Sequence, residues 1–266
     1  RVTMFVTIMM NIISVIGFFI AIYGFMGIPG TGVLGVSIAV IVARIFLLVA
    51  LLWFVYKKLA IRFGIRDVFK IDKTNTKNLM GIGIPSAGEQ LSYQLSQIVI
   101  TSFFAMMGDG AFAARVYILN ISMFCFMFSM ALAQGTQILV ARYVGAKMYE
   151  KTLKRGLKSL RLAFIVSLVI SLIIALVGEE LIGIFTKDPM IIAIAVPVLW
   201  AIVFIEPGRA FNMILLGSLK SVGDVRFPVI IGILSQWGIA VVFSYIFGIH
   251  FALGLLGVWI AQGVDE

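Results

Sequence analysis

Long apolar stretches separated by short polar ones alternate along the whole chain. Most of the apolar stretches reach the roughly 20 residues that an α-helix needs to cross the hydrocarbon core of a bilayer. There are eight: Val2–Tyr23, Val33–Tyr56, Leu79–Met106, Ala114–Ala141, Leu160–Val177, Met190–Leu216, Val225–Phe247 and Phe251–Val264. Barrel strands would show alternating segments of about ten residues instead. The pattern therefore predicts an all-α integral membrane protein, a polytopic bundle with eight transmembrane helices.

Composition supports the membrane class and excludes several others. Hydrophobic residues make up 62% of the 266 residues, charged residues only 12%, and the mean hydropathy is +1.13. A soluble domain is nearer half apolar and a quarter charged. Cys125 and His250 are the only cysteine and histidine. The chain can therefore form neither an internal disulfide framework nor a metal site built from several His and Cys residues.

Positive charge is concentrated in alternate connections between the apolar stretches, and it explains the net charge of +9. Seven Lys or Arg residues lie in 57–78 and six in 142–159, whereas 24–32 and 107–113 contain none. Short basic loops stay on the cytoplasmic side. We therefore expect a multi-pass protein of the plasma membrane, with linker 57–78 and loop 142–159 in the cytoplasm. The charge indicates topology and contact with anionic membrane lipid, not binding to nucleic acid.

A short phrase occurs twice, as GVLGVSIA at 32–39 and as GLLGVWIA at 254–261, 222 residues later. Each copy opens a predicted helix that runs inward from the outer side, and the two helices are six apart in order. A six-helix repeat implies twelve helices in two like-oriented lobes. We therefore expect the chain to be a fragment of a twelve-helix transporter. Residues 1–56 would be the last two helices of the N-terminal lobe, 57–78 a linker, and 79–266 the C-terminal six-helix lobe.

Glu89 is an ionisable residue within the third apolar stretch, about 12 residues inward from Lys77. A charge at the bilayer centre costs at least about 2.5–3.5 kcal/mol, so such residues face a cavity or a partner. The neighbouring polar side chains recur at helical spacing and predict a polar flank that lines a cavity: Gln90, Tyr93, Gln94 and Gln97. The other interpretation is hydrogen bonding that only joins helices.

Glu206 and Arg209 lie three residues apart, around the helix-breaking pair Pro207–Gly208. They could form an internal ion pair. Alternatively, Glu206 could bind a proton or cation, with a kink at Pro207 freeing nearby carbonyls. Arg44 and Arg115 also lie in apolar stretches, where we expect them to neutralise carboxylates or to extend toward an interface.

Catalytic constellations are absent from the sequence. No phosphate-binding loop, nucleophile motif or carboxylate pair on facing helices is present, and a single histidine cannot complete a triad. We expect neither an enzyme nor a cofactor. A resident metal ion is not expected either, apart from sodium held near Glu89 or Glu206.

Four motifs give the chain a family resemblance. They are GIP at 83–85, QILVARYVGAK at 137–147, GSLKSVGDVRFP at 217–228 and GLLGVWIA at 254–261. With these motifs the chain resembles multidrug and toxic compound extrusion (MATE) transporters. The resemblance implies two six-helix bundles around a central cavity that opens alternately to each side. It also implies a monomeric secondary active exporter that exchanges Na⁺ or H⁺ for a small-molecule organic cation, drug or metabolite.

The resemblance also bears on the coupling residues. The acidic positions of better-known branches would fall near Tyr93 and Arg209, each about one turn from Glu89 and Glu206. Coupling would then use Glu89 and Glu206 in a shifted arrangement, or residues of the other lobe. A flippase for lipid-linked sugars, from the same superfamily, is the alternative function. A membrane scaffold or insertase is disfavoured, because it would not need the costly buried carboxylates.

Overall fold

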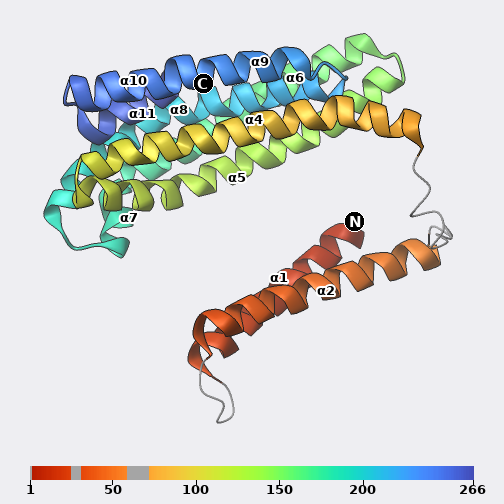
Figure 1. Ribbon diagram of the computed structural model, residues 1–266, viewed down its shortest axis with the longest axis horizontal. Coiled ribbons are helices and arrows are strands. Elements are labelled where there is room, and N and C mark those ends of the chain that lie inside the picture. The colour runs from red at the N-terminus through yellow and green to blue at the C-terminus, as the bar shows by residue number, and fades with distance from the viewer. Residues whose placement is uncertain (1, 25–30, 59–71) are drawn as a thin grey trace. The chain divides into compact units, whose positions relative to one another are not determined.

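A computed structural model describes residues 2–24, 31–58 and 72–266 of the chain (Figure 1). The chain divides into two compact units, Arg1–Asp72 and Lys73–Glu266. Most of the predicted linker, residues 59–71, lies outside the described residues.

The first unit is a pair of helices, α1 (Val2–Tyr23) and α2 (Gly32–Lys58). Small residues let the two backbones approach closely, as is common between membrane helices. A Cβ atom added at Gly17 would lie 2.6 Å from the Cβ of Ala39, and one added at Gly35 would lie 2.8 Å from the Cβ of Ala21. Almost all other described side chains of the pair are at least partly exposed within this unit.

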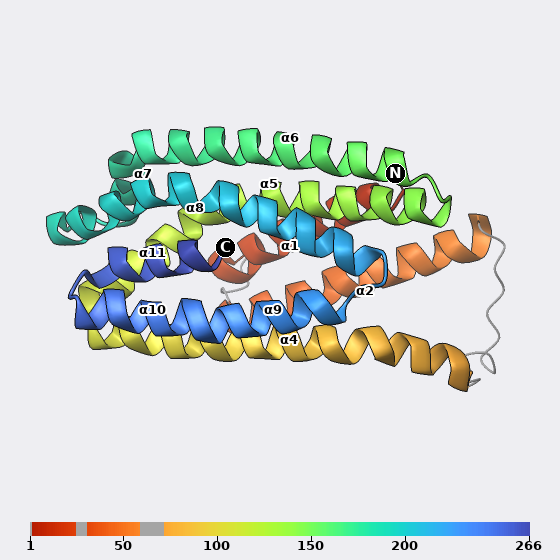
Figure 2. The ribbon, with the colours of Figure 1, turned by 90° about the horizontal axis from the view of Figure 1, so that it is seen from above.

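The second unit is a helical bundle (Figures 1 and 2). Its helices are α4 (Lys73–Met106), α5 (Asp109–Gly145), α6 (Tyr149–Leu176), α7 (Gly178–Phe185), α8 (Pro189–Ser221), α9 (Arg226–Ser235), η1 (Gln236–Val241), α10 (Val242–Tyr245), η2 (Ile246–His250) and α11 (Gly254–Asp265). The segments from α9 to η2 follow one another as a single rod, and this rod lies beside α4 in both views. Two π-helical segments, η1 and η2, interrupt the α-helical pattern of the rod.

Each of the eight predicted segments contains a helix. Within the described part of the chain, six helical segments are long and apolar enough to cross a membrane: α1, α2, α5, α6, α8 and the rod 226–250. The predicted segments 79–106 and 251–264 correspond to α4 and α11. The first carries Glu89 and several glutamines, and the second is a helix of 12 residues.

The connections are shorter than the charge pattern predicted. Helix α4 begins at Lys73, so 73–78 belong to a helix and not to the linker, and α2 likewise extends through Lys58. The predicted loop 142–159 is reduced to 146–148, since α5 ends at Gly145 and α6 begins at Tyr149. Lysine and arginine are good helix formers, so the helices continue beyond the apolar residues by which they were recognised. Residues 178–185, between the fifth and sixth apolar stretches, form α7.

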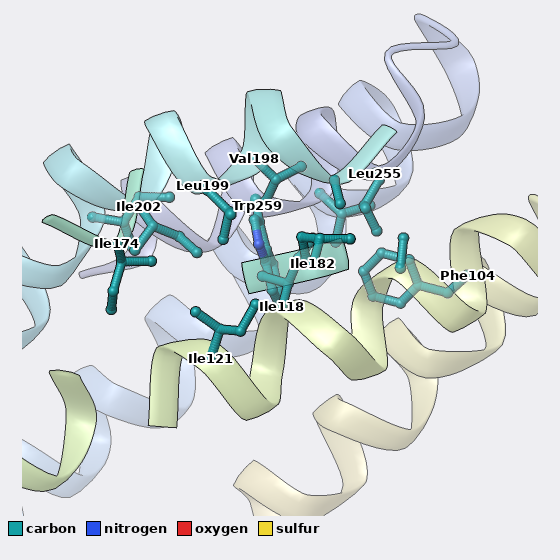
Figure 3. Close-up of a cluster of buried hydrophobic side chains, with 14 of the residues drawn as sticks. Phe104, Ile118, Ile121, Ile174, Ile182, Val198, Leu199, Ile202, Leu255 and Trp259 are labelled. Atoms are coloured by element: carbon teal, nitrogen blue, oxygen red, sulfur yellow. The ribbon is translucent and has the colours of Figure 1, made fainter. Parts of the chain in front are cut away.

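The apolar core of the second unit lies between α4, α5, α6, α7, α8 and α11 (Figure 3). Phe104 and Ile118 are fully buried there, and the ring of Phe104 meets that of Trp259 edge-on with centroids 6.2 Å apart. Two of the sequence motifs also meet in this unit. A Cβ atom at Gly217 of α8 would collide with the Nε2 atom of Gln137 of α5. Glycine at 217 therefore allows the two motifs to pack together.

The repeated phrase has the same local structure in both copies. Its first glycine, Gly32 or Gly254, has a φ angle of +58° and begins a helix. Its second glycine packs closely against preceding residues. Gly35 meets α1, and a Cβ atom at Gly257 would lie 2.6 Å from the carbonyl oxygen of Phe247. The phrase is thus a turn with a left-handed glycine followed by a close helix–helix contact.

Candidate functional site

A buried carboxylate and an arginine form the centre of the candidate site. Glu206 lies near the middle of α8 with a side chain only 1% exposed, and its Oε1 atom accepts a hydrogen bond from Arg209 Nη1 at 2.6 Å. The two residues are neighbours because side chains three apart share a helix face. The second oxygen of Glu206, Oε2, is also buried and has no hydrogen-bond partner among the described residues. One oxygen of this carboxylate thus has a charged partner, whereas the other has none.

On a neighbouring helix, α5, the thiol of Cys125 also interacts with this carboxylate. A thiol is only a weak hydrogen-bond donor. The Cys125 Sγ atom lies 3.7 Å from the carbonyl oxygen of Ser167 on α6, to which it donates. The Cys125 thiol therefore does not give Glu206 Oε2 a strong hydrogen-bond donor.

Helix α11 supplies a second carboxylate to the same arginine. Arg209 Nε lies 2.8 Å from Glu266 Oε1, and Asn212 Nδ2 donates to Glu266 Oε2 at 3.1 Å. Gly263 allows this approach, since a Cβ atom there would lie 2.6 Å from Ile205. The C-terminal end of α11 lies about half way along the bundle in Figure 2. The cluster of Glu206, Arg209, Asn212 and Glu266, called the α8 cluster below, thus carries two carboxylates and one guanidinium.

Helix α8 continues without a break through Glu206, Pro207 and Gly208. The expected break is therefore absent from the hydrogen-bonded helix. Pro207 still lacks an N–H group, so it cannot donate the usual backbone hydrogen bond to the carbonyl of Val203. A backbone oxygen one turn from Glu206 is thus deprived of its normal partner while the helix is maintained.

Glu89 is held by a different partner, Lys220. The Lys220 Nζ atom lies 2.8 Å and 2.6 Å from the two Glu89 oxygens. Lys220 belongs to the last turn of α8, and Glu89 lies near the middle of α4. The Lys220 side chain therefore joins the end of α8 to the middle of α4. Glu89, on α4, and Glu206, on α8, therefore take part in separate charge clusters.

The predicted polar flank of α4 is only partly covered by the second unit. Gln90, Tyr93 and Gln94 are exposed within it, whereas Gln97 is half-buried. Between them, Ser92 Oγ accepts a hydrogen bond of 2.8 Å from Trp237 Nε1 of η1. The exposed side chains therefore lie outside the apolar core of the second unit.

The two predicted charge partners have different surroundings. Arg115, on α5, places its guanidinium carbon 4.8 Å from the ring centroid of Phe104, a cation–π geometry. Its buried Nε atom has no hydrogen-bond acceptor among the described residues. Arg44 is exposed on α2 in the first unit. Neither arginine forms an ion pair with a carboxylate of the described residues.

Sequence reasoning missed Lys220, Asn212 and Glu266 as site residues. In the sequence, Lys220 lies in the connection after the sixth apolar stretch, and Glu266 follows the last apolar stretch. Their partners are 131 and 57 residues away along the chain. The available signal for Glu266 was its position beside an apolar helix, where a charge needs a partner. No group of three or more potential metal-ligating residues occurs in 2–24, 31–58 or 72–266.

Comparison with known protein families matches residues 85–246 to the MatE family. Among curated proteins, the "Uncharacterized transporter YisQ" of Bacillus subtilis is 43% identical over 264 residues, which cover 99% of this chain and 58% of that protein. The "Probable multidrug resistance protein NorM" of Thermotoga maritima is 27% identical, covering 100% of this chain and 57% of that protein. The chain thus spans somewhat more than half the length of these relatives.

Solved structures share the fold. A multidrug resistance MATE family transporter in an outward-facing conformation superposes with a TM-score of 0.85 at 23% identity. A transporter of the MOP superfamily from Pyrococcus furiosus, described as having a binding pocket of reverse polarity, gives a TM-score of 0.84 at 22% identity. Both similarities cover 98% of this chain and 58% of the other. With its apolar helices and its match over 85–246, the chain belongs to the MatE family of multi-pass plasma-membrane transporters.

Proposed function

We propose that the full-length protein is a secondary active exporter, in which inward movement of Na⁺ or H⁺ drives outward movement of an organic cation, drug or metabolite. The observation that carries the proposal is the buried Glu206 carboxylate, with one oxygen paired to Arg209 and the other without a hydrogen-bond partner in the described part of the chain. A carboxylate inside a membrane helix costs free energy. Such residues are therefore candidates for a functional role. Relatives named as multidrug resistance proteins support the substrate class.

Coupling follows from competition at Glu206. A proton or a sodium ion on the carboxylate weakens its attraction to Arg209, which keeps its contact with Glu266. The cation-bound and cation-free states then favour different openings of the cavity, because a ligand shifts a conformational equilibrium by its differential affinity for the two states. The carbonyl of Val203 is a further oxygen that a sodium ion could use. The coupling ion is transported, so the protein needs no resident cofactor.

Glu89 is the second coupling candidate. Lys220 lies within 2.8 Å of both of its oxygens, so a coupling cation would have to displace an ammonium group. Gln90, Tyr93, Gln94 and Gln97 would line the cavity beside it. We also propose that the protein acts as a monomer. The ends of α4, α5 and α6 that carry Lys and Arg would face the cytoplasm.

Arg209 bears on the alternative, a flippase for lipid-linked sugars. An arginine in the cavity would suit the phosphates of such a lipid. However, two carboxylates already bind Arg209, and its side chain is only 24% exposed. The α8 cluster therefore favours a cation over an anionic ligand.

Efflux of a fluorescent organic cation from cells expressing the full-length protein tests the proposal. We expect Glu206→Gln to reduce efflux by roughly 5- to 150-fold, the factors to which typical coupling free energies correspond. Glu179→Gln, which changes an exposed carboxylate on α7, is the matched control and should keep wild-type efflux. Unchanged efflux in Glu206→Gln at equal expression would contradict a coupling role for this residue. Absence of wild-type efflux for several organic cations would favour the flippase.

A further inference from the structure

The N-terminal turns of α6 carry five cations on a single face. Their spacing of i, i+3, i+4, i+7 and i+10 places them within about a third of the helix circumference. They are Lys151, Lys154, Arg155, Lys158 and Arg161, called the α6 stripe below. All five are exposed, and none forms an ion pair with a described residue. Like charges at these spacings repel one another along a helix.

The same face continues as an apolar surface. After Arg161 the helix has no charged residue before its end, and the positions that follow the stripe in register are exposed hydrophobic side chains. They are Leu162, Ile165, Val169, Leu172, Ile173 and Leu176, each at least 40% exposed. One face of α6 is therefore cationic over its first turns and apolar over the turns that follow.

The opposite face of α6 is the one that packs in the second unit. Ser159, Leu160, Ala163 and Ser167 are buried there, where α6 contacts α5 and α8. Helix α6 lies at the edge of this unit in Figure 2. The α6 stripe is thus not needed to hold the bundle together, and its charges are available to a partner outside this unit.

From this arrangement we propose that the α6 stripe binds the headgroup of an anionic phospholipid, whose acyl chains lie on the apolar continuation of the same face. An anionic headgroup relieves the repulsion between the five cations. Clusters of Lys and Arg at the cytoplasmic end of a membrane helix are typical of segments that bind anionic lipid headgroups. The acyl chains cover side chains that a soluble anion would leave bare. The occupant is therefore a lipid and not a free phosphate ion.

Purified full-length protein in mixed micelles provides the test. The melting temperature is followed by tryptophan fluorescence while phosphatidylglycerol or phosphatidylcholine is titrated into the micelles. We expect phosphatidylglycerol to raise the melting temperature and phosphatidylcholine to have little effect. In the variant Lys154→Gln/Arg155→Gln/Lys158→Gln, the apparent Kd for phosphatidylglycerol should rise by roughly 10- to 100-fold.

The matched control removes three other exposed cations, with Lys58→Gln/Lys73→Gln/Lys77→Gln. It should retain the wild-type response to phosphatidylglycerol. An equal loss in this control would show a general charge effect and overturn the α6 site. Equal stabilisation of the wild type by both lipids would overturn it as well. Stabilisation by inorganic phosphate alone, lost in the α6 variant, would assign the stripe to a soluble anion.

Discussion

At the residue scale, Arg209 is the cation that balances the two carboxylates of the α8 cluster. It contacts Glu206 on its own helix and Glu266 at the end of α11, at 2.6 Å and 2.8 Å. Removing the arginine leaves two carboxylates without their cation, whereas removing the charge of Glu206 leaves the Arg209–Glu266 contact intact. The two substitutions should therefore lower the free energy of unfolding by different amounts.

This difference is a testable prediction. Arg209→Met should lower the free energy of unfolding of the full-length protein by about 3–5 kcal/mol, as is typical when one partner of a buried ion pair is removed. Glu206→Gln should cost about 1–3 kcal/mol, the range for losing a buried hydrogen bond. Denaturant titration in detergent micelles measures both values. An Arg209→Met variant as stable as the wild type would contradict the structural role of this arginine.

The pair of Glu89 and Lys220 makes a separate prediction. Their side chains are 23% and 31% exposed, so the contact should contribute less than the buried one. A double-mutant cycle with Glu89→Gln and Lys220→Met should give a coupling energy of roughly 0.2–1 kcal/mol, reduced at high salt. Additive effects of the two substitutions would show that the ion pair does not stabilise the bundle in solution.

How far the candidate site could be predicted depends on sequence separation. Glu206 and Arg209 are three residues apart on one helix, so helix geometry alone predicts their pairing as one alternative. Lys220 meets Glu89 across 131 residues, and Glu266 meets Arg209 across 57. These contacts depend on how α4, α8 and α11 pack, which is not encoded in local periodicity. Tertiary packing therefore decides which carboxylate keeps an unpaired oxygen.

At the element scale, apolar length predicts the helices but underestimates several of them. Helix α5 covers Asp109–Gly145 and α6 begins at Tyr149, so only residues 146–148 connect them. The cationic first turns of α6 look like loop in a hydropathy pattern, yet they are helical and lead directly into the apolar part. Charged helix ends are expected for membrane helices that extend beyond the hydrocarbon core.

The repeated glycine phrase gives a prediction at this scale. A Cβ atom at Gly257 would meet the carbonyl oxygen of Phe247 at 2.6 Å, so Gly257→Ala should destabilise the contact of α11 with the rod by about 1–3 kcal/mol. At Gly238 in the same unit, an added Cβ would meet no described atom within 4 Å. Gly238→Ala should be neutral or stabilising by up to about 1 kcal/mol, because alanine favours helix. Melting temperatures of the two variants compare these effects, and equal values would contradict the packing argument.

At the scale of the whole molecule, the fold class could be predicted because the same hydropathy and charge pattern recurs in every segment. The helices, the membrane class and the family resemblance all follow from patterns that recur along the chain. The two copies of the repeated phrase also agree in structure, because Gly32 and Gly254 have the same backbone conformation. The family resemblance is confirmed by the match over 85–246.

The proposed transport concerns the full-length protein, because this chain spans about 58% of the relative from Bacillus subtilis. We propose that a cation at Glu206 drives export. Proteoliposomes that contain the full-length protein test this role most directly, with a Na⁺ or a pH gradient imposed and transport of a fluorescent organic cation recorded. We predict that one of the two gradients accelerates transport in the wild type and in Glu179→Gln, and that Glu206→Gln abolishes the acceleration. Equal acceleration in Glu206→Gln, or transport indifferent to both gradients, would contradict the claim.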